Sequence, residues 1–163
     1  MPRLIIALAV AICLAGSAQA QEADVRFGGL RQDTGLPVEV DADKLSVDQA
    51  AGGAVFEGNV MVRQGEMRLT AARIQVEYGD DGTGISRLHA TGGVTLVSPE
   101  DAAEAQEAVY TIDTGIVVMT GNVLLTQGSA AISGEALSIN LRDGTGTMTG
   151  RVKTVFTPGG KAP

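Results

Sequence analysis

Few residues in this chain have the types and spacing that chemistry on a substrate would need. His89 is the only histidine, and Cys13 is the only cysteine. A metal ion needs several ligands at once, and a nucleophilic serine needs a base beside it, so a single histidine supports neither kind of site. We therefore expect a protein that is not an enzyme, with no catalytic residue, no metal and no cofactor. His89 is predicted to lie at the surface or at a strand edge.

Two acidic stretches could suggest calcium: Asp41 to Asp43 together with Asp48, and the Gly-Asp-Asp-Gly sequence at 79–82. Calcium needs six or more converging oxygens, often including a glutamate at a fixed later position, and neither stretch supplies that spacing. Aspartate and glycine are also the preferred residues of turns. The prediction is therefore a turn at 79–82 and a strand start at 41–43.

The first twenty residues predict a secretory signal peptide. Arg3 is the only charge before Glu22, residues 4–15 form an apolar run too short to span a bilayer, and residues 18–20 read Ala-Gln-Ala, as at a cleavage site. A lipid anchor on Cys13 is disfavoured because Ile12, rather than a small residue, precedes it. We expect a periplasmic protein whose mature chain begins at Gln21 and contains no cysteine.

The charge of the chain excludes some partners. It has 19 acidic and 12 basic residues, and removal of Arg3 with the signal leaves a net charge near −8. Nucleic acids and anionic membrane surfaces attract lysine and arginine, so neither is an expected partner. No second apolar segment is long enough to cross a membrane.

An internal repeat organises the rest of the sequence. Residues 55–65 recur as residues 118–128, with six of eleven positions identical at an offset of 63. Within the repeat, a Gly-x-Val element recurs at Gly58, Gly92, Gly121 and Gly150. Segments of alternating polar and apolar residues, such as 73–78 and 136–141, lie between these elements and predict half-buried strands. Residues 99–108 are rich in Glu and Ala, but the repeat predicts an irregular strand there rather than a helix.

Alternation along the predicted strands separates an apolar face from a polar one. We expect the four repeated glycines to share the apolar face. Aromatic residues are few, two Tyr and three Phe without Trp, so an aliphatic interior could leave room for hydrocarbon. Periodicity alone favours side chains that pack against one another. The predicted apolar lining consists of Leu45, Val47, Phe56, Val60, Val62, Ile74, Val76, Val94, Leu96, Tyr110, Ile112, Met119, Val123, Leu125, Leu137 and Ile139.

The repeated Phe-Glu-Gly-Asn-Val at 56–60, its copy at 119–123 and the paired strands resemble the OstA-like family of lipopolysaccharide transport proteins, and in particular its small periplasmic members. The resemblance covers most of the chain after the signal. It implies an open antiparallel β-jelly roll of two splayed sheets, with the acyl chains of lipopolysaccharide bound in a trough. It also implies end-to-end assembly with copies of itself, with an inner-membrane transporter component and with an outer-membrane translocon.

On this interpretation residues 1–20 are the signal, 21–36 a flexible N-terminal segment, 37–157 the jelly-roll domain and 158–163 a flexible tail. Unpaired edges of an open sheet invite strand addition. The candidate partner edges are Val38 and Val40 at one end, and Val152 and Phe156 at the other.

Three alternatives remain open at this point. One is a structural β-helix that polymerises through its ends, like a bactofilin, although such scaffolds are cytoplasmic and would not carry a signal peptide. Another is a membrane-anchored sister component of the same transport system. The third is a jelly-roll enzyme such as a cupin, for which a lone histidine is too few metal ligands.

Overall fold

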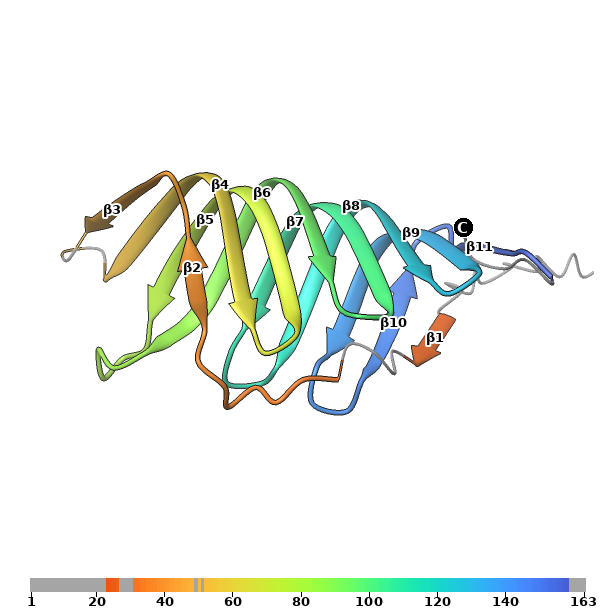
Figure 1. Cartoon of the computed structure of the whole chain (residues 1–163), viewed down its shortest axis with the longest axis horizontal. Coiled ribbons are helices and arrows are strands. Elements are labelled where there is room, and N and C mark those ends of the chain that lie inside the picture. Colours follow the sequence, from red (N-terminus) through yellow and green to blue (C-terminus); the bar gives the residue numbers. More distant parts are fainter. Residues whose placement is uncertain (1–22, 27–30, 49, 51, 159–163) are drawn as a thin grey trace, which may run out of the picture.

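Every regular element in the described part of the chain is a β-strand. The computed structural model describes residues 23–26, 31–48, 50 and 52–158. None of these residues forms a helix with the length and hydropathy of a membrane span. The strands, shown in Figure 1, are β1 Ala23–Arg26, β2 Glu39–Asp41, β3 Lys44–Asp48, β4 Gly53–Gln64, β5 Met67–Tyr78, β6 Ile85–Val97, β7 Asp101–Thr111, β8 Ile116–Gln127, β9 Ala130–Asn140, β10 Thr145–Thr149 and β11 Lys153–Phe156.

The strands form one eleven-stranded antiparallel sheet. Its order is β1-β10-β9-β8-β7-β6-β5-β4-β2, with β3 also paired to β4 and β11 also paired to β9. Strands β4 to β10 therefore follow one another as a meander joined by short turns. The all-β, open antiparallel prediction is confirmed. A bactofilin-like β-helix is excluded, because all of the described strand pairs are antiparallel.

A line of bulges bends the sheet across its middle. In β4, Gly58 and Asn59 have φ of 79° and 46°, and together they oppose the single residue Ala72 of β5. Gly121 and Asn122 repeat this conformation in β8, with φ of 86° and 48°. An extra residue in one strand kinks it and increases its twist. We name this line of residues, 58–59, 72, 92–93, 106, 121–122, 135 and 150–151, the crest.

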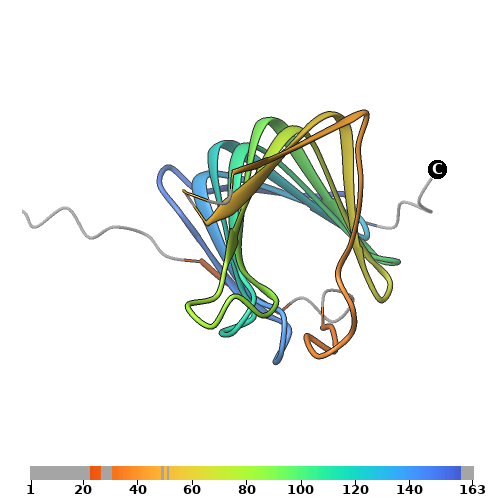
Figure 2. The same cartoon turned by 90° about the vertical axis from the view of Figure 1, so that its left-hand side faces the viewer.

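The crest divides the sheet into two walls, which are seen end-on in Figure 2. The β2 wall comprises β2, β11 and the strand halves 60–64, 67–71, 94–97, 101–105, 123–127 and 130–134. The β3 wall comprises β3, β10 and the halves 53–57, 73–78, 85–91, 107–111, 116–120 and 136–140. The expected two sheets are thus two halves of one sheet, and the repeated glycines lie on the bend rather than on the apolar face.

Two segments outside the clearest repeat units also contain strands. Residues 21–36 were expected to be flexible, but β1 within them pairs with β10, and Gln32 donates its backbone N–H to the Leu141 carbonyl over 2.7 Å. Within 99–108, β7 starts at Asp101 and is interrupted only by the bulge between Glu104 and Glu107. The strand prediction is therefore confirmed there, because β6 and β8 both need β7 as a hydrogen-bonding partner.

Candidate functional site

The space between the two walls gathers most of the predicted lining. Twelve predicted residues are 1% exposed or less: Val60, Val62, Ile74, Val76, Val94, Leu96, Tyr110, Met119, Val123, Leu125, Leu137 and Ile139. Phe56 and Ile112 are partly buried and pack against this cluster. Both kinds of strand in the repeat therefore direct apolar side chains to one continuous interior, which we call the trough.

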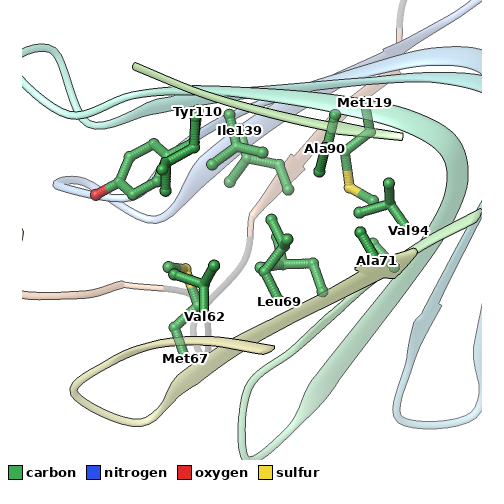
Figure 3. Packing of buried hydrophobic residues seen from close by; sticks show 14 of the residues in the cluster. Val62, Met67, Leu69, Ala71, Ala90, Val94, Tyr110, Met119 and Ile139 are labelled. Carbon is green, nitrogen blue, oxygen red and sulfur yellow. The ribbon is translucent and has the colours of Figure 1, made fainter. Parts of the chain in front are cut away.

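The trough is filled by its own side chains in this structure. Val62, Met67 and Leu69 of the β2 wall face Tyr110 and Ile139 of the β3 wall (Figure 3). Their exposures of 2% or less mean that almost no water-sized space adjoins them. The walls thus pack as a protein core does, and hydrocarbon could enter only if they moved apart or if something covering the trough were displaced.

Several residues of the trough were missed by the sequence analysis. The inner residues of β5 are Met67, Leu69 and Ala71 before the crest but Ile74 and Val76 after it, so the alternation shifts by one residue there. The same shift occurs between Ala105 and Ala108 in β7, and between Ile132 and Leu137 in β9. The sequence does contain a sign of this shift, because the alternation of apolar and polar residues is interrupted at each of these points. Each break lies opposite a Gly-x-Val element.

Both rims of the trough expose apolar side chains. Leu45 and Val47 of β3, which were predicted to be lining residues, are 54% and 59% exposed. Their strand neighbours Phe56 and Ala54 point inward, but β2 is too short to cover this end. At the other rim, Phe156 of β11 is 71% exposed. Apolar side chains thus continue to both ends of the sheet, where no strand of the opposite wall covers them.

The predicted partner edges are edge strands. Val38 and Val40 are partly buried beside or within β2, the last strand of the sheet order. Val152 leads into β11, which pairs only with β9 in the described sheet. The second edge is shared, however, because β1 covers β10 in the β3 wall. From the sequence, this edge was predicted at Val152 and Phe156 alone. No strand was predicted at 23–26, because these four residues show no clear alternation of polar and apolar side chains.

The side of the trough opposite the crest, which we call the mouth, is crossed by residues 31–38. Gln64 of the β2 wall, 1% exposed, donates its side-chain amide to the carbonyls of Thr34 and Leu36 over 3.1 and 2.9 Å. Tyr110 of the β3 wall donates its hydroxyl to Gln64 Oε1 over 2.7 Å. A polar bridge therefore joins the two walls and the crossing segment at one point.

Burial at this bridge raises the pKa of Tyr110 above its ordinary value of 10.0. The positive charge of Arg142 and the hydrogen bond to Gln64 lower the pKa, but desolvation is the larger effect. The hydroxyl is therefore protonated at neutral pH and acts as a donor. It supports structure at the mouth rather than proton transfer.

The other candidate residues lie outside the trough. His89 is half-buried on the outer face, where Nε2 is 3.5 Å from Glu107 Oε2. Asp41 pairs with Arg63 over 2.9 Å. Asp81 accepts bonds from the backbone N–H and hydroxyl of Thr83, which lower its pKa and confirm the turn at 79–82. Across residues 23–158, as far as they are described, no three His, Cys, Asp or Glu residues gather as metal ligands would.

A bent antiparallel sheet around a continuous apolar interior matches a known family. The family model for the LptA/LptD N-terminal-domain lipopolysaccharide transport proteins matches residues 39–145. The chain belongs to this family. The match includes the whole of β2 to β9 and the first residue of β10, so it covers nearly all of both walls.

Relatives of the family are similar over much of their length. An uncharacterised protein of Rhizobium meliloti is 28% identical over 171 residues, covering 96% of this chain and 92% of that protein. The lipopolysaccharide export system protein LptA of Escherichia coli K12 is 26% identical over 117 residues, which are 68% of this chain and 63% of LptA. The crystal structure of LptH, a periplasmic LptA homologue from Pseudomonas aeruginosa, superposes with a TM-score of 0.69 at 19% identity, covering 78% and 99% of the two chains. The LptH structure supports the fold.

Proposed function

We propose that this protein is a periplasmic, non-catalytic carrier that binds the acyl chains of lipopolysaccharide between its two walls and passes the lipid toward the outer membrane. The observation that carries the proposal is the trough itself. It is a continuous, mostly aliphatic interior that reaches both rims, where Leu45, Val47 and Phe156 are exposed. A protein that needed only a core would gain nothing from apolar side chains left uncovered at both ends.

The energetics favour such a route for a lipid. Each methylene group exposed to water costs roughly 0.8 kcal/mol, so an acyl chain of about a dozen carbons would cost on the order of 10 kcal/mol in the periplasm. The trough would replace that water with aliphatic side chains. Since the lining is almost entirely Val, Leu, Ile, Met and Ala, few polar groups would hold the lipid at one place, and it could slide.

The comparisons support lipopolysaccharide as the ligand. Lipopolysaccharide is named in the family description and in the names of LptA and LptH, and LptH is named as a periplasmic component. By this likeness we assign the present chain to the same task, with the inner-membrane transporter component at one end and the outer-membrane translocon at the other. Further copies would stack end to end between them, which joins the apolar rims into a longer trough.

Photocrosslinking tests the ligand and its location in one experiment. A photoreactive residue at Ile74, Val123 or Ile139, all inside the trough, should label with lipopolysaccharide, whereas one at Gln75 or Ser138 should not. Ile139 and Ser138 form the sharpest pair, because they are neighbours in β9 on opposite faces. Equal labelling at both positions, or labelling only at Ser138, would refute the trough as the binding site.

A charge at the rim tests the stacking. Leu45→Asp should weaken end-to-end association in sedimentation experiments, because it places a charge among the apolar side chains of that end. Ser46→Asp is the matched control, since it lies on the same exposed strand with its side chain on the other face. Unchanged association in the Leu45 variant would rule out this rim as the contact.

The N-terminal sequence of the protein recovered from the periplasm tests the localisation. Residues 1–20 lie outside the described residues, and we expect the recovered chain to begin at Gln21. A chain that retained them in the membrane fraction would instead support the membrane-anchored sister component.

A further inference from the structure

We propose that residues 31–38 form a displaceable strap, which closes the mouth of the trough in the empty protein and is released when acyl chains load. This inference rests on the proposed lipid binding and adds the route by which the lipid would enter. The strap is the orange coil that passes below the walls and leads into β2 (Figures 1 and 2). It crosses from the β3 wall, at Leu141 and Arg142, to the β2 wall, at Gln64.

The strap is held by polar contacts rather than by a ladder. On the β3 wall, Gln32 N–H bonds to the Leu141 carbonyl over 2.7 Å, and Arg142 Nε donates to Thr34 Oγ1 over 3.3 Å. On the β2 wall, the Gln64 amide donates to the carbonyls of Thr34 and Leu36. Residues 31–38 form no strand, whereas adjacent long strands of the walls share nearly continuous ladders.

Most of the strap's own residues are already in contact with water. Arg31, Asp33, Gly35, Leu36 and Pro37 are already exposed on it. The polar atoms near it at the mouth, the Gln64 amide and the Tyr110 hydroxyl, could bond to water after it leaves, whereas Val38 would lose its packing against the core. Separating the walls at the crest would require breaking the backbone geometry of every bent strand, so the mouth is the side at which opening costs least.

The turn between β7 and β8 fits closely against the strap and offers a position to lock it. A Cβ atom built on Gly115 would lie 3.1 Å from Thr34 Cγ2 and 3.0 Å from Arg142 Cγ, so a sulfur in place of the Thr34 methyl group would be within reach of a cysteine at 115 once the Arg142 side chain shifts. The test is therefore the Thr34→Cys/Gly115→Cys pair in a Cys13→Ser background, so that the pair holds the only thiols. A photoreactive residue at Ile139 reports loading of purified lipopolysaccharide.

We expect at least a tenfold loss of labelling in the oxidised protein and full recovery after reduction of the same sample. Because the two states share one sequence, strain from a side chain at Gly115 (φ +70°) affects both. Equal labelling in the two states would overturn the strap. Absence of labelling in both states and in the unlocked parent would instead refute the proposed lipid binding.

A second variant keeps the inference testable if the disulfide does not form. Arg142→Gln removes the tether to Thr34, together with a bond from the guanidinium to the Asp113 carbonyl outside the strap, and should load lipopolysaccharide about fivefold faster, a factor equivalent to the one net hydrogen bond made to the strap. Arg87→Gln, an arginine paired with Glu77 on the outer face, is the matched control and should load at the parent rate. An unchanged loading rate in the Arg142 variant would count against the strap.

Discussion

The crest and the mouth close the same trough by different means. At the crest, β4, β6 and β8 bend where glycine or asparagine takes a positive φ, as at Gly58 and Asn59, so closure is built into the backbone. At the mouth, closure depends on side chains and on a segment distant in sequence, because Gln64 bonds to Tyr110 and to residues 34 and 36. Closure at the crest is therefore permanent, whereas closure at the mouth can be released by displacing the strap, as proposed above.

The largest effect is expected at the crest, where Gly92→Ala should destabilise the fold by about 2–4 kcal/mol. A Cβ at Gly92 would meet Ala72 Cβ at 2.7 Å, and the residue has φ of 84°. Gly93→Ala is the control, since it has φ of 87° but no atom within 4 Å, and it should lose only about 1–2 kcal/mol. Urea denaturation measures both. Equal losses would show that the close approach at the crest is unimportant.

The next largest effect is expected at the mouth, where Gln64→Ala should cost about 2 kcal/mol. It leaves the buried Tyr110 hydroxyl and two partly buried backbone carbonyls without their partner. Gln75→Ala, an outward-facing glutamine of β5, should stay within about 0.5 kcal/mol of the parent. Thermal or urea unfolding measures the difference. If the two variants matched, the bridge would contribute nothing to closure.

A smaller, pH-dependent effect should distinguish the mouth from the crest. The pKa of Tyr110 is raised in the folded protein, so above pH 10 the folded protein keeps a proton which the unfolded chain releases. The stabilising contribution of the protonated Tyr110 to the free energy of unfolding is therefore complete below pH 10 and is lost as the pH rises above it. Tyr110→Phe should be about 1 kcal/mol less stable than the parent at pH 7. The gap should narrow above pH 10, because the variant lacks this titration. A gap that stayed constant with pH would contradict the assignment.

The smallest effect should be a gain at the last crest position. Arg151 has φ of 48°, in the place where earlier repeats have Asn59 or Asn122. Asparagine adopts the left-handed region more readily than arginine, so Arg151→Asn should stabilise the fold by about 0.5 kcal/mol, although an exposed pair with Glu135 at 3.6 Å is lost. Chemical denaturation with repeated measurements can resolve this. A clear loss of stability would show that the ion pair outweighs the backbone preference.

The fold class was predictable because its signals are local. Alternation of polar and apolar residues identified the strands, and the spacing of the repeat placed them in order. The apolar face was read correctly for β4, β6 and β8, where the parity of inner residues continues through the bulge, as from Phe56 to Val60. It was incomplete for β5, β7 and β9, where Met67, Leu69 and Ile132 were missed because the parity shifts opposite each bulge.

The sequence alone determined that the chain is a β-repeat with one aliphatic face, because side-chain period and turn residues act over a few positions. Only the tertiary structure decided that Gly58, Gly92, Gly121 and Gly150 align into one bend, that the two walls pack together, and that residues 31–38 cross the mouth. These features depend on contacts such as Gln64 with Thr34, which are 30 residues apart, and on Arg142 with Thr34, which are 108 apart. No local pattern in the sequence specifies such long-range pairs.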